Sequence, residues 1–322
     1  MADALYGPTG FYSGSGRAGR RGDFITSPEV GPLFGAVVSR FLDAEWRRIG
    51  QPNEFTVVDV GAGPGALARS VLASRPACSG ALRYVAVDIS AAQRAQHPVE
   101  VESVAEAPSG PFDGVIIANE LLDNLPFRLA VYDGAWREAF VTESGDGRFV
   151  ERLGAPLSPL PAVLPARAVL GARAPLQDSA AAWVTAALGR LARGVVVVFD
   201  YVSPTTAALA ERPWRDWLRT YRAHERGGHY LASPGSQDIT AEIAIDQLPE
   251  PAAVRSQAQW LGLHGIDELV AEGKRQWAEH AARPDLAAIA MRSRVAEAEA
   301  LLEPGGLGGF AVLEWRPVGA PA

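Results

Sequence analysis

The chain is poor in the residues and runs that mark disulfide-bonded, metal-binding or membrane proteins. Its 322 residues include one cysteine, Cys78, which excludes an intrachain disulfide, a cysteine-based zinc site and an iron–sulfur cluster. No pair of histidines has the H-E-x-x-H spacing of a metalloprotease. No apolar run reaches the ~18 residues of a membrane helix, and residues 1–7 carry neither part of a signal peptide. We therefore expect a soluble, cytoplasmic protein without a bound metal or a membrane partner.

Positive charge is also scarce. The chain has 30 lysine and arginine residues against 37 aspartate and glutamate residues, a net charge of −7 at pH 7. Such a chain has no general attraction to nucleic acid, so we expect no nucleic-acid partner. Only Lys274 among the cations is a lysine, and this preference for arginine, together with much alanine, suggests a GC-rich bacterial genome.

Short apolar runs alternate with helical segments in the first part of the chain. Strand-like runs are found at 55–60, 82–88, 99–104 and 112–118, and helical spacing is found at 66–74 and 90–96. This alternation is typical of a parallel sheet with helices on both faces. A five-residue apolar run before Asp200 and a strand-like tail at 310–316 complete the predicted α/β, doubly wound core.

Other segments interrupt this alternation. The first 30 residues are rich in glycine and have no period, so we expect a loop segment. Residues 128–150 are predicted to form β-hairpins around Asp-Gly turns, and the proline-rich stretch 154–177 is predicted to be a connector. Residues 205–302 are predicted to be a mainly helical insertion that serves as a substrate or lid subdomain. The predicted core is therefore 31–204 together with 303–322.

The most informative motif is a glycine-rich turn between a buried strand and a helix. Gly61, Gly63 and Gly65 follow Asp59, and such a turn lets a ligand approach the backbone at a helix N-terminus. The spacing fits both a dinucleotide loop and the first motif of S-adenosylmethionine methyltransferases. Asp59 favours the second class, because an acid there would repel a pyrophosphate but attract the cationic amino-acid end of S-adenosylmethionine. A third interpretation is a glycine turn without any cofactor.

Acids also follow the next two strands of the predicted sheet. Asp88 ends the second strand, where a carboxylate can accept both ribose hydroxyls of either cofactor class. Asn119, Glu120 and Asp123 follow the strand at 112–118. There Asn119 could bind the methyl donor or the acceptor, Glu120 could pair with a cationic acceptor, and Asp123 could orient or deprotonate it. The local alternative is that Asn119 caps a short helix whose first turn holds the acids.

Several of these segments together resemble the MidA-type methyltransferases, the family of the mitochondrial complex I assembly factor that methylates arginine. The resemblance covers nearly the whole chain. It is carried by residues 10–13, 19–29, 59–65, 88–90 and 119–126, and by 221–222, 234–235, 238–241 and 256–257 in the insertion. It departs from the family pattern at Asp59, where Glu is usual, and at Asn124, where a small residue is usual.

The resemblance implies a class I, Rossmann-like methyltransferase that uses S-adenosylmethionine and releases S-adenosylhomocysteine. It implies that residues 1–30 close over the site, that Asp23, Thr26, Ser27 and Pro28 fold over the cofactor, and that Ile89 and Asn119 join the cofactor site.

The implied reaction is an in-line transfer of the sulfonium methyl to an arginine side chain of a protein partner. A carboxylate pair such as Glu120 and Asp123 could localise the charge of the guanidinium and take up its proton. Two other functions stay open: methylation of a small molecule on the same scaffold, and a non-catalytic assembly factor that binds S-adenosylmethionine. A homodimer is also left open.

Overall fold

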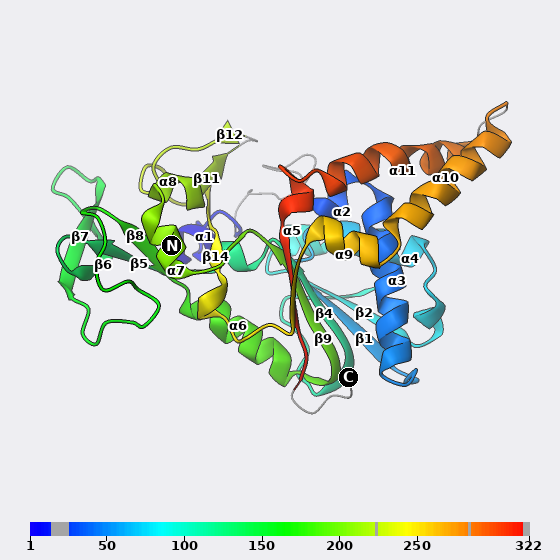
Figure 1. The fold of residues 1–322 in the computed structure, drawn as a ribbon, viewed down its shortest axis with the longest axis horizontal. Coiled ribbons are helices and arrows are strands. Elements are labelled where there is room, and N and C mark those ends of the chain that lie inside the picture. Colours follow the sequence, from blue (N-terminus) through cyan, green and yellow to red (C-terminus); the bar gives the residue numbers. More distant parts are fainter. Residues whose placement is uncertain (14–25, 223–224, 283–284, 318–322) are drawn as a thin grey trace.

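The computed structural model describes residues 1–13, 26–222, 225–282 and 285–317. A seven-stranded sheet forms its centre, in the order β15-β16-β9-β4-β1-β2-β3 (Figure 1). Its strands are β1 (Phe55–Val60), β2 (Leu82–Val87), β3 (Glu102–Val104), β4 (Phe112–Asn119), β9 (Leu191–Asp200), β15 (Ala253–Ser256) and β16 (Ala311–Trp315). Six of these strands agree with the predicted ones to within a few residues, whereas β15 lies in the segment predicted to be mainly helical.

The direction of the strands creates a crevice at one edge of the sheet. Strands β3, β2, β1, β4 and β9 run parallel, whereas β16 is antiparallel to both β9 and β15. The chain proceeds from β1 through β2 to β3 on one side and then returns to place β4 on the other side of β1. In such sheets ligands bind beyond the carboxyl ends of the strands at this switch point, which here lies between β1 and β4.

Both faces of the sheet are covered by helices. Along β1, β4 and β9 alternate side chains belong to different core clusters: Val57 packs toward α3 (Pro32–Arg48) and α4 (Ala66–Ala73), whereas Val58 packs toward α6 (Asp178–Gly189). The α3 face is extended by α9 (Gln257–Leu263), α10 (Ile266–His280) and α11 (Leu286–Leu302) (Figure 1). The near-continuous apolar strands follow from this double burial.

A second, antiparallel sheet stands beyond the core. It has the order β7-β6-β5-β8 and consists of β5 (Arg128–Tyr132), β6 (Trp136–Glu143), β7 (Phe149–Pro156) and β8 (Arg173–Leu176). The predicted hairpins are present. The prediction of a simple connector over 154–177 is wrong at both ends. At its start, β7 extends to Pro156, and at its end β8 pairs with β5 as an edge strand, a position at which Pro175 is tolerated.

The segment 205–302 is more mixed than its helical pattern indicates. It contains α7 (Thr206–Glu211), α8 (Trp214–Trp217) and α9 to α11, but also a sheet of order β12-β11-β13. These strands are β11 (Leu218–Arg222), β12 (Glu225–Arg226) and β13 (Asp238–Ala241), and β14 (Ile243–Ala244) pairs with β10 (Val202–Ser203). One strand of the predicted insertion, β15, belongs to the central sheet. The division of the chain into a core and an inserted subdomain stays a prediction.

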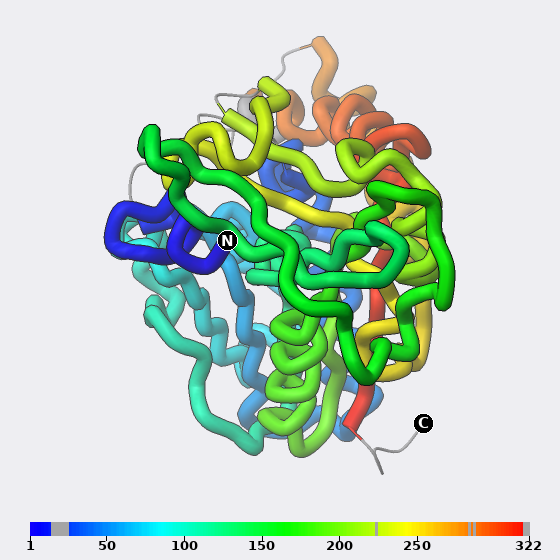
Figure 2. Tube along the Cα trace, turned by 90° about the vertical axis from the view of Figure 1, so that its left-hand side faces the viewer, coloured from blue at the N-terminus to red at the C-terminus, as the bar shows by residue number. Residues whose placement is uncertain are grey.

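The N-terminal segment packs against these outer sheets rather than against the core. Leu5 of α1 (Ala2–Tyr6) and Phe11 share a buried cluster with Leu129 of β5, Trp217 of α8 and Ile239 of β13. Figure 2 shows this segment, in dark blue, beside the green residues of the second sheet. Across the described ranges, none of the helices combines the length and apolar character needed to cross a membrane.

Candidate functional site

The glycine loop makes a sharp bend between β1 and α4. Gly61, Gly63 and Gly65 have φ values of +74°, +52° and +80°, which side chains with a Cβ rarely adopt. The N–H groups of Gly61 and Ala62 donate to the carbonyl of Val87, at 2.9 and 3.0 Å. The loop is therefore held open above β2, with its backbone accessible to a ligand.

Asp59 lies inside β1 and is 3% exposed. The hydroxyl of Tyr84 donates to its Oδ2 at 3.0 Å. Burial raises the pKa of Asp59 to about 7, although the bond from Tyr84 acts in the opposite direction. A cation placed beside this carboxyl group would favour its charged form.

Asp88 holds the glycine loop from the end of β2. Its Oδ2 accepts from the N–H of Gly63 at 2.9 Å, and its Oδ1 accepts from the N–H of Ser90 at 2.8 Å. Burial raises the pKa of Asp88, while these two backbone bonds oppose the rise. Each carboxylate oxygen can accept at least one more hydrogen bond. The observed role of Asp88 is to anchor the loop, and its binding of ribose hydroxyls stays a prediction.

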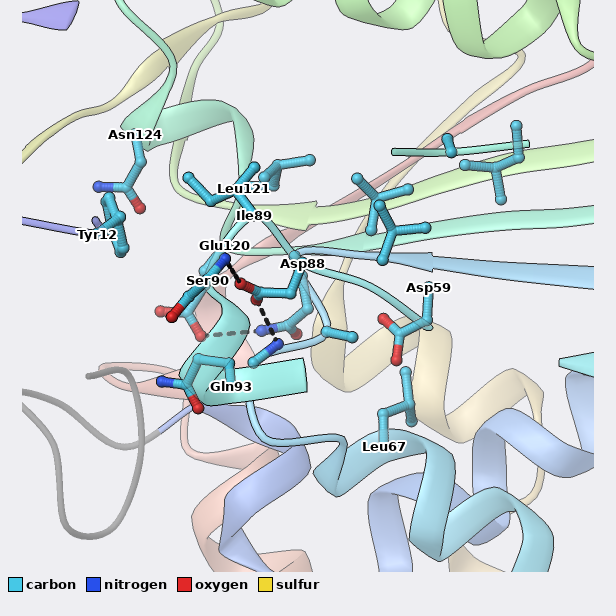
Figure 3. Close-up of a pocket in the computed structure, with 18 of the residues that line it drawn as sticks. Tyr12, Asp59, Leu67, Asp88, Ile89, Ser90, Gln93, Glu120, Leu121 and Asn124 are labelled. Atoms are coloured by element: carbon cyan, nitrogen blue, oxygen red, sulfur yellow. Dashed lines mark hydrogen bonds between the residues drawn. The ribbon is translucent and has the colours of Figure 1, made fainter. Parts of the chain in front are cut away.

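A cavity of about 560 Å³ opens between these loops and the end of β4. This volume lies in the usual range of ligand pockets. Asp59 and Tyr12 lie toward opposite ends of the lining drawn in Figure 3, with Asp88 and Glu120 between them. Sequence-predicted residues in the lining are Thr26, Pro28, Asp59, Gly61, Gly63, Asp88, Ile89, Asn119 and Glu120.

Glu120 is presented to this cavity by an unusual backbone conformation. Its φ is +52°, and its N–H donates to the carbonyl of Phe199 at the end of β9, at 2.8 Å. The Nδ2 of Asn119 donates to Oε1 of Glu120 at 3.1 Å, while the buried Oδ1 of Asn119 has no hydrogen-bond partner within the described residues. Burial, followed by the charge of Asp123, holds the pKa of Glu120 well above its usual range.

Asp123 lies behind the cavity rather than in its lining. It is 4% exposed, and its Oδ2 accepts a hydrogen bond from the hydroxyl of Thr240 on β13. Burial raises the pKa of Asp123 to about 7. The structure thus brings Glu120 and Asn119 to the cavity but does not bring Asp123 there, and its catalytic role stays a prediction.

The local alternative for this segment is wrong in two respects, because Asn119 does not cap the short helix and Glu120 precedes it instead of standing in its first turn. The short 3-10 helix spans Leu122–Asn124 with Leu121 at its N-cap, and Asn119 binds Glu120 instead of capping it. The cap comes from β9: Oδ2 of Asp200 accepts from the N–H of Leu122 at 2.9 Å. Asp123 does stand in the first turn, as that alternative expected.

The predicted N-terminal residues are divided. Thr26 and Pro28 line the cavity. Ser27 is fully buried beside it, and its hydroxyl donates to Oε1 of Gln257 at 2.9 Å. Gly65 serves as the left-handed N-cap of α4 and is not in the lining. Asp23 lies outside the described residues.

Four residues close the far end of the cavity, and the sequence alone assigns a role to none of them. The hydroxyl of Tyr12 and the Nδ2 of Asn124 each donate to Oδ1 of Asp238, both at 3.0 Å. The hydroxyl of Tyr6 donates to the carbonyl of Asn124 at 3.0 Å. Tyr6, Tyr12 and Asn124 line the cavity. The only sequence signal for Tyr12, Asn124 and Asp238 is membership in the 10–13, 119–126 and 238–241 segments of the family resemblance, and Tyr6 lies outside all of these segments.

The turn after β3 and the helix α6 also contribute to the lining. Ala105 and Glu106 follow β3 and line the cavity, as does Trp183 of α6. Within the described part of the chain, no three His, Cys, Asp or Glu side chains form a group that could hold a metal ion.

Comparison with known proteins decides which cofactor class this loop belongs to. Residues 37–264 match a family model described as "Putative S-adenosyl-L-methionine-dependent methyltransferase". The chain belongs to this methyltransferase family. Its membership confirms the predicted S-adenosylmethionine class over the dinucleotide class, and with the sheet described above it confirms the class I, Rossmann-like fold.

Similar proteins point in the same direction. The chain is 28% identical over 302 residues to the mitochondrial protein arginine methyltransferase NDUFAF7 homolog of Drosophila melanogaster, an alignment covering 81% of this chain and 67% of that protein. It is 25% identical to NDUFAF7 of Xenopus laevis, covering 76% of this chain and 63% of that protein. These relatives bear out the MidA-type resemblance, and the chain spans about two thirds of their length.

Solved structures extend the likeness to the whole chain. A Burkholderia thailandensis crystal structure with bound S-adenosyl-homocysteine is 26% identical, with a TM-score of 0.84, and covers 100% of this chain and 87% of that one. A native structure of a protein from the same organism has 27% identity, a TM-score of 0.80 and the same coverage.

Proposed function

We propose that this protein transfers the methyl group of S-adenosylmethionine to an arginine side chain of a protein acceptor. The single observation that carries the proposal is Glu120, a half-buried residue whose carboxyl group has a raised pKa and lines the same cavity as the glycine loop. The names of the curated relatives, which are protein arginine methyltransferases, support the choice of acceptor.

The donor end of the cavity suits a cationic, ribose-bearing ligand. Asp59 would face the amino-acid end of the donor, and Asp88 would accept from its ribose. Gly61 and Gly63, which line the cavity, leave the loop without side chains where the ligand approaches. Bound S-adenosylmethionine supplies an electrophilic methyl group on a sulfonium centre.

The part of the cavity that runs from Glu120 in its middle to Tyr12 at its far end suits a guanidinium acceptor. In the absence of a cation, burial and the charge of Asp123 raise the pKa of Glu120 and so favour its protonated form. A guanidinium would favour the carboxylate, because an opposite charge nearby lowers the pKa of an acid. Glu120 would then orient the guanidinium and take up the proton released from its nitrogen. The unpartnered Oδ1 of Asn119 would accept an N–H bond.

Asp123 is a positioning residue in this proposal. Its charge raises the pKa of Glu120, and so increases the basicity of that carboxylate toward the acceptor. The bond from Thr240 fixes Asp123 in place.

Two measurements test the proposal. Isothermal titration should detect binding of S-adenosylhomocysteine, the product. Tritiated S-adenosylmethionine should then label a protein fraction of a bacterial lysate, with the label recovered as methylarginine after acid hydrolysis. Absence of binding would contradict the donor assignment. Label recovered only in small molecules, or in residues other than arginine, would contradict the acceptor.

A further inference from the structure

A second cavity, of about 430 Å³, lies within the segment 205–302. Its walls come from α8, β11, β12 and the loop that follows β12. Within the described chain it shares no lining residue with the first cavity. The residues that characterise it are Trp214, Arg215, Arg219, Arg226, His229 and Tyr230.

One wall of this cavity is aromatic. The ring of Trp214 meets the rings of His229 and Tyr230 edge to face, at centroid distances of 5.5 and 5.6 Å, and those two rings stack at 4.3 Å. The guanidinium of Arg215 lies 5.0 Å from the centroid of Trp214. Burial lowers the pKa of His229, so this imidazole belongs to the uncharged wall at neutral pH.

The other feature is a pair of arginines that lack acidic partners. Among the described residues, neither Arg215 nor Arg226 has a carboxylate within 4 Å, whereas the third arginine of the lining, Arg219, pairs with Glu242 at 3.2 Å. The Nη2 of Arg226 donates to the carbonyl of Arg215, so the two cationic residues are neighbours. Asp216 is the one acid in the described lining.

The contrast with Arg173 shows what these two residues lack. Arg173, which also contacts the ring of Trp214 at 5.2 Å, binds Glu151 with both Nη1 and Nη2, at 2.5 and 2.6 Å. The same aromatic ring thus contacts one neutralised guanidinium and one, Arg215, that is not neutralised. Guanidinium groups bind carboxylates in a planar, bidentate manner.

We propose that the second cavity binds an acidic side chain of a polypeptide, between Arg215 and Arg226 and against Trp214. Both arginines are exposed, and β12, which carries Arg226, is an edge strand, so an extended chain has access to them.

A short path connects this cavity with the first. Arg219 lines the second cavity, and its guanidinium lies 5.9 Å from the ring of Tyr201. Tyr201 directly follows β9, whose Phe199 carbonyl holds the backbone of Glu120. A polypeptide whose arginine reaches Glu120 could therefore place a nearby acidic residue at Arg215. The statement that the bound polypeptide is the methyl acceptor rests on the proposed function. The binding of its acidic side chain does not.

The test uses a hexaglutamate peptide as the probe, followed by the fluorescence of the tryptophans and by isothermal titration. Arg215→Gln and Arg226→Gln should each weaken binding about 5-fold, and the double variant should weaken it further but not additively, because the two neighbouring arginines share one carboxylate. Arg222→Gln is the matched control, because it removes an exposed arginine of β11 that does not line the cavity. Binding should also weaken as salt is raised.

S-adenosylhomocysteine affinity, measured on the same samples, separates this proposal from the proposed function. We expect the double variant to bind S-adenosylhomocysteine as the unaltered protein does, which also shows that it is folded. Failure of the unaltered protein to bind hexaglutamate, or equal losses in Arg222→Gln, would overturn the second site. Equal affinity for free glutarate or inorganic phosphate would overturn its assignment to a polypeptide. If the unaltered protein does not bind S-adenosylhomocysteine, only the proposed function is overturned.

Discussion

The two ends of the main cavity are built in different ways. At the donor end, Asp59, the glycine loop and Asp88 come from two adjacent strands, and Asp88 holds the loop through the N–H of Gly63. At the acceptor end, Tyr12, Asn124 and Asp238 come from three distant parts of the chain and meet through side-chain hydrogen bonds. The donor end is therefore a local structure, and the acceptor end is a product of the tertiary fold.

This difference indicates how each end can change. The donor end depends on backbone geometry, so few substitutions are compatible with it. The acceptor end depends on side chains carried by separate elements. Asn124, for example, donates to Asp238 and to the carbonyl of Ile239 without contacting the backbone of the glycine loop.

The largest expected effect separates chemistry from donor binding. Glu120→Gln should lower kcat about 100-fold or more, since removal of a general base typically costs that much. S-adenosylhomocysteine affinity should stay within about 2-fold, because an amide retains the bond from Asn119. Radiometric turnover and isothermal titration measure the two quantities. A variant that loses both equally would show that the two ends are not separable.

A second substitution tests the donor end. Asp88→Ala removes two hydrogen bonds to a charged acceptor and should weaken S-adenosylhomocysteine binding about 30-fold. Asp113→Ala is the control, because it removes a β4 carboxylate whose partner is Arg193, away from the cavity. Comparable affinities for the two variants would refute the donor assignment.

The pKa of Asp59 predicts a smaller effect of pH. Because its pKa is raised to about 7 in the free protein, the carboxylate is mostly protonated at pH 6 and mostly charged at pH 8. The ammonium group of S-adenosylhomocysteine favours the charged form of Asp59, so the Kd of S-adenosylhomocysteine should be about 10-fold higher at pH 6 than at pH 8.

Asp59→Asn separates this effect from the titration of Asp88 and Glu120. The variant should bind S-adenosylhomocysteine more weakly at pH 8 and show a flatter dependence on pH. If the Kd of Asp59→Asn depends on pH as that of the unaltered protein does, the pH dependence belongs to another carboxyl group.

The smallest expected effect concerns the acceptor end. Tyr12→Phe removes one of the bonds that Oδ1 of Asp238 accepts from described residues, and those from Asn124 and from the N–H of Ile239 are kept. The free energy of unfolding should fall by about 1 kcal/mol, measured by urea denaturation. The acceptor KM should rise while S-adenosylhomocysteine affinity stays the same. Tyr132→Phe, on β5 beside Trp136, is a control that should leave the acceptor KM unchanged.

The same comparison explains which site residues can be predicted from the sequence and which cannot. Asp59, Gly61, Gly63 and Asp88 stand within one strand–helix–strand unit, so their spacing alone places them at one edge of the sheet. Glu120 follows because β4 ends at that edge. The bond between Tyr12 and Asp238 joins residues 226 positions apart, and no local pattern brings them together.

Asp123 and β8 show two further limits. The spacing of Asn119, Glu120 and Asp123 gives no sign that Glu120 has a left-handed φ, which presents it to the cavity while Asp123 lies behind. The strand β8 is only four residues long and holds Pro175, so neither its length nor its composition distinguishes it from a connector. It becomes a strand because β5 supplies a partner.

The reversed strand β16 has a consequence for biosynthesis. It lies between β9 and β15, so the edge of β9 has no partner until residues 311–315 have been synthesised. Until then the chain exposes a strand of valines, Val195–Val198, that could pair with other nascent chains. The same strand supplies the carbonyl that holds Glu120, so we expect this part of the cavity to become ordered only once β16 has paired with β9, and chaperones to protect the strand until then.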